Sequence, residues 1–258
     1  MKKTLKVIKI GGNVINSPDA LELFLQAFSK LDGNKILVHG GGAVAGKIME
    51  EMGIQPRMID GRRITDEATL QVVTMVYAGL INKRVVAVLQ RFGDNALGLS
   101  GADGNVIRAV KRPAGEIDYG FAGDVEAVNT TVIDGLLNMG LVPVFNSIVH
   151  NRQGQLLNTN ADTIASEVAA AMSGLYETEL IYVFEKPGVM SDPENGTVIP
   201  LITEKDFERL KAEGVISSGM IPKMTNCFNA LRRGVERVFI TGKDNFTGDE
   251  KGTKVKLH

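Results

Sequence analysis

Two clusters of glycine residues each lie between an apolar, strand-like segment and a helix-like segment. Gly11-Gly12 follows residues 5–10, and Gly40-Gly41-Gly42 closely follows residues 35–38. Glycine lets the backbone approach a ligand closely, and amide groups exposed before a helix bind anions. A single cluster of this kind is usually only a tight turn. Two clusters at the carboxyl ends of parallel strands favour an anionic ligand, because such sheets bind ligands at that edge.

Lys9 lies inside the first apolar segment, just before the first glycine cluster. Side chains alternate along a strand, so we expect Lys9 to share a face with Val7, opposite Lys6 and Ile8. A cation beside free amide groups suits a phosphoryl group in transit, because phosphoryl transfer depends mainly on positioning and charge stabilisation. These residues therefore indicate phosphate chemistry.

Two common phosphate-binding motifs nearly match the second glycine cluster. Residues 41–48 have the spacing of a Walker A loop, but Ile48 stands where that loop needs a hydroxyl group to bind magnesium. Residues 40–45 fit the glycine pattern of dinucleotide-binding enzymes, and Asp60 lies at the distance expected for their acidic residue. Because the segment around Asp60 lacks the pattern of a strand, a NAD-dependent dehydrogenase remains a minor alternative.

The elements that must position these residues have the pattern of an α/β fold. Strand-like and helix-like segments alternate in the first fifty residues, and Ser17-Pro18-Asp19 is typical of a helix start. The alternation continues along the chain, so we expect a parallel sheet covered by helices. A helical period covers 67–89, strands at 106–110 and 124–128 could form a hairpin, and an alanine-rich helix covers 163–172. We expect one continuous unit whose two lobes meet near residues 172–179.

The composition excludes several classes of protein. The 258 residues are 44% apolar and 23% charged, which is typical of a globular chain and not of a disordered one. A formal net charge of −1 offers no electrostatic footprint for nucleic acid. Cys227 is the only cysteine, so we expect a buried small residue and neither a disulfide nor a zinc site. We also expect a soluble, cytoplasmic protein without a membrane-spanning segment, since no secretory apolar region follows the first lysines.

A set of short motifs, in order along nearly the whole chain, resembles the amino-acid kinase superfamily. The motifs are VIKIGG at 7–12, VHGGG at 38–42, GRRIT at 61–65, NK at 82–83, LSGADG at 99–104, VN at 128–129, LNTNAD at 157–162, SGMIPK at 218–223 and GT at 252–253. Each motif is weak alone, whereas the ordered set is specific. Within the superfamily, the set is most similar to the branch that phosphorylates N-acetyl-L-glutamate.

The resemblance implies a fold and a reaction. The implied fold is a three-layer αβα sandwich around a mainly parallel central sheet, in one domain over residues 1–258. An N-terminal lobe of about 1–175 would bind the acylated amino acid and form a homodimer, and a C-terminal lobe of about 176–258 would bind ATP. The implied reaction moves the γ-phosphoryl group of ATP onto the side-chain carboxylate of N-acetyl-L-glutamate, in the second step of arginine biosynthesis. Mg²⁺ is expected as part of the ATP complex, without a protein-built metal site.

The resemblance also implies roles for particular residues. Lys9 and Lys223 would stabilise charge on the phosphoryl group, and Asp162 would orient both lysines. The amides of Gly12 and Gly42 would donate hydrogen bonds to the phosphoryl oxygens. The residues expected to bind the acylated amino acid are Gly41, Gly42, Arg63 and Asn158, with Arg63 clamping its α-carboxylate. The residues expected to bind the nucleotide are Lys9, Gly11, Gly12, Glu185, Gly219, Met220 and Lys223.

Each of these roles has a plainer alternative. Lys223 could be a surface lysine at a helix start, and Asn158 and Asp162 could be capping residues before a helix at Thr163. His39 is expected to support its glycine loop structurally and not to act as a catalyst.

The sequence departs from the superfamily pattern in three places. Residues 184–188 read FEKPG, where Thr or Ser followed by Asp is usual and helps to hold the nucleotide. Residues 145–147 read FNS in place of small residues near the acyl group. No helix precedes Lys6, which favours a homodimer without feedback inhibition by arginine.

Several alternatives stay open at this point. The acceptor could be N-succinyl-L-glutamate, and the chain could instead be a carbamate, glutamate 5-, aspartate or uridylate kinase of the same superfamily. It could also be a nonenzymatic relative that senses an amino acid or a nucleotide.

Overall fold

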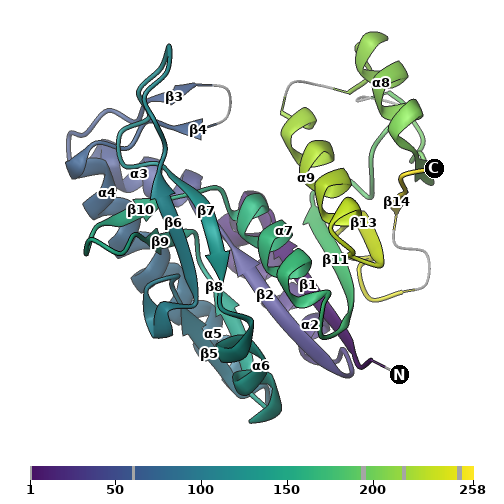
Figure 1. Ribbon diagram of the computed structural model, residues 1–258, viewed down its shortest axis with the longest axis horizontal. Coiled ribbons are helices and arrows are strands. Elements are labelled where there is room, and N and C mark those ends of the chain that lie inside the picture. The colour runs from purple at the N-terminus through teal and green to yellow at the C-terminus, as the bar shows by residue number, and fades with distance from the viewer. Residues whose placement is uncertain (1, 60–61, 193–195, 217–218, 249–251) are drawn as a thin grey trace.

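The computed structural model describes residues 2–59, 62–192, 196–216, 219–248 and 252–258, whose arrangement is shown in Figure 1. Asp60, Gly61 and Ser218, which belong to the motifs discussed above, lie outside the described residues. Strands and helices alternate along most of the described chain. The prediction of an α/β fold is therefore confirmed.

An eight-stranded sheet forms the centre of the molecule, in the order β12-β14-β13-β11-β1-β2-β8-β5. Among these described strands, every neighbouring pair is parallel except β13 with β14. The strands of this sheet are β1 (Thr4–Ile10), β2 (Asn34–His39), β5 (Ala96–Leu99), β8 (Val142–Phe145), β11 (Glu177–Phe184), β12 (Leu201–Ile202), β13 (Arg237–Gly242) and β14 (Thr253–Val255). The expected mainly parallel sheet is thus present.

Helices cover both faces of the sheet, which gives the expected three layers. The helices that pack into the apolar cluster on one face are α6 (Thr130–Asn138), α7 (Ala161–Met172), α8 (Glu204–Ala212) and α9 (Ile221–Arg232). Those that pack on the opposite face are α1 (Gly12–Asn16), α2 (Pro18–Ser29), α3 (Gly42–Glu51), α4 (Glu67–Thr74) and α5 (Asn82–Arg91). In Figure 1, α7 and α9 lie side by side in front of the sheet, and α2 lies behind it.

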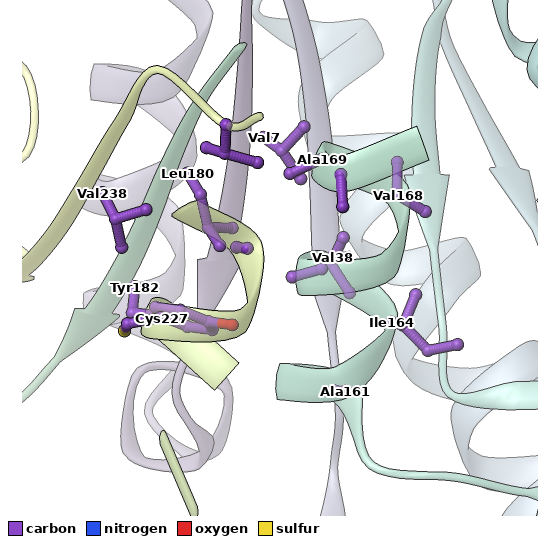
Figure 2. Close-up of a cluster of buried hydrophobic side chains, with 14 of the residues drawn as sticks. Val7, Val38, Ala161, Ile164, Val168, Ala169, Leu180, Tyr182, Cys227 and Val238 are labelled. Carbon is purple, nitrogen blue, oxygen red and sulfur yellow. The ribbon is translucent and has the colours of Figure 1, made fainter. Parts of the chain in front are cut away.

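The central strand β1 shows how the sequence produces these two faces. Its apolar side chains alternate: Leu5 and Val7 belong to the cluster around α7, and Ile8 and Ile10 belong to the opposite cluster. All four are fully buried, as expected for a parallel strand covered on both sides. Figure 2 shows Val7, with side chains of neighbouring strands, turned toward the side chains of α7 and α9.

A smaller, four-stranded sheet lies beside the central one, in the order β10-β9-β6-β7. It contains the antiparallel hairpin that the sequence predicts, formed by β6 (Ile107–Lys111) and β7 (Gly123–Val128). The other two strands, β9 (Ile148–His150) and β10 (Leu156–Asn158), and the two-residue pair β3 (Met58–Ile59) and β4 (Arg62–Arg63), were not predicted. These short strands matter because two predicted site residues, Arg63 and Asn158, lie on them.

The predicted helix over 67–89 is present as a continuous segment that changes its winding. Between α4 and α5, residues Met75–Ile81 form the π-helix η1. Insertions of this kind occur often at functional sites.

By length and mean hydropathy, the 25-residue segment Glu67–Arg91 could cross a membrane, contrary to the expectation that no segment could. One such helix is weak evidence of a span, because core helices of soluble proteins also reach this length and hydropathy; in this segment 44% of the most apolar window is buried within the protein.

Candidate active site

Three strands of the central sheet end side by side and carry the candidate site at their carboxyl edge. Ile10 of β1 lies opposite His39 of β2 on one side and Val183 of β11 on the other. The residues that follow each strand therefore meet at one edge of the sheet, as expected for parallel strands. The two glycine clusters, with Gly12 and Gly40 28 positions apart in the sequence, are brought together in this way.

The first glycine loop is fixed by close packing between β1 and β11. The Gly11 N–H donates a hydrogen bond of 2.8 Å to the Val183 carbonyl. A Cβ atom at Gly11 would lie 3.1 Å from that same oxygen, so the close approach of the two strands favours glycine. Gly12 is the first residue of α1, and the amides of a first helical turn have no partner within the helix.

The second glycine loop is supported by buried side chains beneath it. At Gly41, where φ is +156°, a Cβ atom would lie 2.2 Å from Cδ1 of Ile81 and 3.1 Å from the Tyr77 ring, so the position favours glycine. Gly42 then begins α3. His39, which is fully buried, places Nδ1 2.8 Å from the Gly40 carbonyl and Nε2 3.0 Å from the side-chain amide of Asn82.

The His39 ring is held neutral by its surroundings. Burial lowers its pKa from 6.5 to about 4, although the hydrogen bond with the Gly40 carbonyl opposes the shift. With Nδ1–H donating to Gly40 and Nε2 accepting from Asn82, both ring nitrogens are used. The ring therefore braces the loop, in agreement with the structural role expected from the sequence.

Two lysines from distant parts of the chain converge on one carboxylate. Lys9 Nζ lies 2.6 Å from Oδ1 of Asp162, and Lys223 Nζ lies 3.9 Å from Oδ2. The side chains of Lys9 and Asp162 are about nine-tenths buried, whereas that of Lys223 is 26% exposed. Lys9 points to the face of β1 that carries Val7, as predicted from the strand alternation. The ammonium group of Lys223 also donates to the Gly219 carbonyl at 3.3 Å.

Asp162 reaches this position because α7 begins two residues earlier than the sequence indicated. The N-cap is Asn160, whose side-chain oxygen accepts a 2.7 Å hydrogen bond from the Asp162 N–H. The alternative in which Asn158 and Asp162 cap a helix at Thr163 is therefore wrong. The Asp162 carboxylate is left to bind the lysines.

A cavity of about 430 Å³ lies beside the lysine pair. Of the residues predicted to bind the nucleotide, those that line it are Lys9, Gly11, Gly12, Glu185, Met220 and Lys223. Gly219 is not among its lining residues and takes part through its carbonyl bond with Lys223. Phe184, Lys186 and Gly188 also line it, and they belong to the segment 184–188 whose positions usually help to hold the nucleotide. The lining residues that the sequence did not indicate are Asn13, Val14, Val189, Met190, Val215 and Ile216.

Arg63, predicted to bind the acceptor, lies beside the second glycine loop. Its Nη2 donates a 2.8 Å hydrogen bond to the Gly42 carbonyl, and Nη1 lies 3.4 Å from the sulfur of Met49. Asn158, at the end of β10, donates to the Thr65 hydroxyl at 3.1 Å, and that hydroxyl donates to the Arg63 carbonyl at 3.1 Å. The structure thus connects Arg63 and Asn158 through a buried threonine.

The residues predicted to bind the acceptor, Gly42, Arg63 and Asn158, lie next to the residues that hold the two lysines. A Cβ atom at Gly40 would lie 3.6 Å from Cβ of Ala161, the residue before Asp162. Gly42, Arg63, Asn158, Asp162 and the lysines therefore form one connected set, and the segment 158–162 joins its two halves.

Tyr77 on the π-helix is a further neighbour of this group that sequence reasoning missed. Its ring lies 3.1 Å from the position of a Cβ at Gly41, and its hydroxyl lies 3.9 Å from that of a Cβ at Gly42. Burial raises the pKa of Tyr77, and the hydrogen bond and charge of Arg63 oppose this rise. Its sequence signal, one apolar residue in a helical stripe, is indistinguishable from that of a core residue.

Phe145 and Asn146, which belong to the segment 145–147 that departs from the superfamily pattern, make contacts within the protein itself. Phe145 is fully buried in the core. The Asn146 side chain donates to the Leu99 carbonyl at 3.0 Å and accepts from the Ile148 N–H at 2.9 Å. These contacts explain Asn146 as a brace between β5, β8 and β9, and they do not place it at the cavity.

Comparison with known proteins identifies the class to which this fold and site belong. The model of the amino acid kinase family matches residues 4–242, and the chain belongs to this family. This confirms the resemblance drawn from the ordered motifs and argues against a dehydrogenase.

The relatives with the higher sequence identities are acetylglutamate kinases. The chain is 51% identical over 257 residues to the acetylglutamate kinase of Bacteroides fragilis, covering 99% of this chain and 98% of that relative. It is 38% identical over 257 residues to the acetylglutamate kinase of Methanopyrus kandleri, covering 98% and 100% of the two chains.

Solved structures share the fold at lower identity. An N-acetylglutamate synthase from Neisseria gonorrhoeae, complexed with coenzyme A and N-acetyl-glutamate, matches with a TM-score of 0.83 and 22% identity, covering 99% of this chain and 60% of that one. A carbamate kinase from Giardia lamblia bound to AMP-PNP matches with a TM-score of 0.73 and 14% identity, covering 100% and 99%. At these identities the likeness shows the fold alone.

Proposed function

We propose that this chain is an ATP-dependent kinase that phosphorylates the side-chain carboxylate of N-acetyl-L-glutamate to N-acetyl-L-glutamyl 5-phosphate, in arginine biosynthesis. The observation that carries the proposal is the pair of lysines joined by Asp162 at the sheet edge where two glycine loops meet. The 51% identity to an acetylglutamate kinase supports this acceptor above others of the family.

The chemistry requires positioned charge and no base. The acceptor carboxylate is already ionised near pH 7, so its oxygen attacks the γ-phosphorus directly. One phosphorus–oxygen bond forms to the carboxylate, the bond between the γ-phosphorus and the bridging oxygen breaks, and ADP leaves with the electron pair. Lys9 and Lys223 stabilise the negative charge on the transferring group, and the amides of Gly12 and Gly42 donate to its oxygens. Asp162 keeps the two ammonium groups aimed at the same place.

The acceptor binds at the second glycine loop in this proposal. Arg63 clamps the α-carboxylate, since its planar guanidinium matches a carboxylate with two parallel hydrogen bonds. Asn158 binds the acylamino group, and Gly41 and Gly42 form the floor of the site. Support comes from the contact of Arg63 with Gly42 and from the link between Asn158 and Thr65.

The nucleotide binds in the cavity beside the lysines, with Gly11, Glu185 and Met220 around it, and Gly219 contributes by accepting a hydrogen bond from Lys223. Mg²⁺ enters as part of the substrate, MgATP. Asp162 is already occupied by two lysines, and among the described residues no three His, Cys, Asp or Glu side chains gather into a metal site. Magnesium is commonly held through substrate phosphates and water, which suits this arrangement.

The proposal extends to assembly and location. We place acceptor binding and dimerisation in residues of about 1–175 and nucleotide binding in about 176–258. Exposed Met75 and Leu80 on η1, and the position of β5 at the edge of the central sheet, support a homodimer. Sedimentation equilibrium tests it, and a monomer at micromolar concentration would contradict it. We place the enzyme in the cytoplasm, without nucleic-acid or membrane partners.

A panel of acceptors tests the reaction. ADP release is measured with MgATP and N-acetyl-L-glutamate, N-succinyl-L-glutamate, L-glutamate, carbamate or uridine monophosphate. The highest kcat/KM is expected with N-acetyl-L-glutamate, and a higher value with any other acceptor would overturn the assignment. Lys9→Ala should lower kcat by about 10²–10³-fold. The matched control is Lys6→Ala, three residues away on the opposite face of β1, which should retain activity.

A further inference from the structure

The ring of Phe184 contacts both lysines of the site. Phe184 is the last residue of β11, lines the cavity and is half-buried. The centre of its ring lies 5.4 Å from Lys9 Nζ and 5.1 Å from Lys223 Nζ. The two lysines come from different elements, β1 and α9, so one side chain contacts cations from both sides of the site.

The position of this ring is fixed by its neighbours. Tyr182 lies two residues earlier, on the same face of β11, and the two rings are nearly parallel, at 12° and 6.3 Å. The Tyr182 hydroxyl donates to the backbone carbonyl of Asp162 at 2.9 Å. On the other side, a Cβ atom at Gly11 would lie 3.3 Å from Cδ1 of Phe184. The ring is therefore braced against the same helix turn and glycine loop that form the site.

The charges at the site give this ring a physical role. Two ammonium groups share the single carboxylate of Asp162, so one positive charge is left over and the two cations repel each other. The face of an aromatic ring attracts a cation, most strongly where water is partly excluded. Phe184 thus supplies a second attraction for both lysines without adding an anion that would repel phosphate.

We propose that Phe184 is a positioning residue for phosphoryl transfer, whose ring holds the ammonium groups of Lys9 and Lys223 together at the cavity. The inference rests on the proposed function for its catalytic consequence, but the contact itself is independent of the acceptor. Phe184 belongs to the segment 184–188 in which the sequence departs from the superfamily pattern, so the aromatic side chain is a feature of this chain that the motifs did not explain.

Two substitutions at Phe184 distinguish the effect of the aromatic face from the effect of the side chain's apolar volume. Phe184→Leu removes the aromatic face and keeps an apolar side chain, whereas Phe184→Tyr keeps the face. Phe184→Leu should lower kcat by about tenfold or more, because two cation–aromatic contacts are lost, with the KM for N-acetyl-L-glutamate changed by less than about twofold. Phe184→Tyr should stay within about threefold of the parent protein in kcat. Equal losses in both variants, or an unchanged kcat in Phe184→Leu, would overturn the proposal.

Phe92→Leu is the matched control. The Phe92 ring also lies beside a cation, 4.7 Å from the guanidinium carbon of Arg91. Phe92 stands at the end of α5, just before β5 begins, so it lies at the amino ends of the parallel strands and away from the candidate site. This variant should retain the parent kcat, and a loss equal to that of Phe184→Leu would show a general packing effect and overturn the proposal.

A spectroscopic measurement tests the contact without any acceptor. Methylene protons beside the face of an aromatic ring resonate upfield, so the Hε signals of Lys9 and Lys223 should be shifted in the parent protein and in Phe184→Tyr. The signals are assigned by their loss in Lys9→Arg and Lys223→Arg. Unshifted signals in the parent protein would overturn the inference even if the kinase activity is confirmed, and shifted signals would support it even if the acceptor is a different one.

Discussion

The buried pair of Lys9 and Asp162 gives the sharpest test of how this site is built. Their charged atoms lie 2.6 Å apart, and both side chains are about nine-tenths buried. Removing one partner of such a pair leaves an uncompensated buried charge, which typically costs about 3–5 kcal/mol. For Asp162→Asn we expect a loss of about 3 kcal/mol in the free energy of unfolding. In a chain of this length that corresponds to a fall of roughly 6–12 °C in Tm.

The double variant separates charge pairing from packing. Lys9→Met should cost less, about 2 kcal/mol, because Asp162 keeps Lys223 at 3.9 Å. In the Lys9→Met/Asp162→Asn variant no buried charge is left alone, so the total loss should be about 2 kcal/mol and not the sum of about 5. The coupling of about 3 kcal/mol is measured by urea unfolding followed by circular dichroism. All three variants should lose about 10²-fold or more in kcat.

A surface pair provides the control for this cycle. Lys47 and Glu51 lie 4.0 Å apart on α3, with side chains 79% and 63% exposed, so the corresponding cycle should show no measurable coupling. If the single losses at Lys9 and Asp162 simply add in the double variant, the pair is not coupled and the reasoning is refuted.

Three further predictions concern other parts of the molecule. Arg63→Ala should raise the KM for N-acetyl-L-glutamate by about tenfold or more with a smaller effect on the KM for ATP; an unchanged acceptor KM in steady-state kinetics would remove its clamp role. Lys35→Met should lower the free energy of unfolding by about 3 kcal/mol, because the buried ammonium group donates to three carbonyls at the end of α2 and pairs with Asp94 at 2.8 Å. Adding Asp94→Asn should restore part of this stability, as measured by urea unfolding. No restoration would contradict the pairing. The pKa of His39 is lowered from 6.5 to about 4 in the folded protein, so between these pH values the unfolded chain binds a proton that the folded chain does not. The free energy of unfolding should therefore fall by up to about 3 kcal/mol as pH drops from 6.5 to 4. Urea unfolding at a series of pH values measures this fall, and His39→Gln should remove most of it.

The features that the sequence predicted correctly depend on local patterns. The alternation of β1 places Lys9 on the face of Val7, and the structure puts both toward α7. Ser17 caps α2 as expected, accepting from the Ala20 N–H at 3.3 Å. Strand period and helix capping are properties of neighbouring residues, so a single sequence carries them in full.

The features that the sequence did not predict depend on contacts between distant residues. His39 and Asn82 are 43 positions apart, and neither neighbourhood indicates that their side chains bond beneath the glycine loop. The same holds for Phe184, which contacts two lysines on different elements. The sequence pattern did not predict the π-helical winding around Tyr77, because this winding changes the helical period over only seven residues, Met75–Ile81. The roles assigned to individual site residues stay predictions until the variants are measured.

The single cysteine makes the opening of the core directly measurable. Cys227 is fully buried on α9 beside Tyr182 of the central sheet, and burial raises the pKa of its thiol far above the usual value. A thiol reagent can therefore react only when α9 moves away from this layer. The rate of labelling, with and without MgATP, reports how often the region behind Lys223 opens, and no engineered probe is needed.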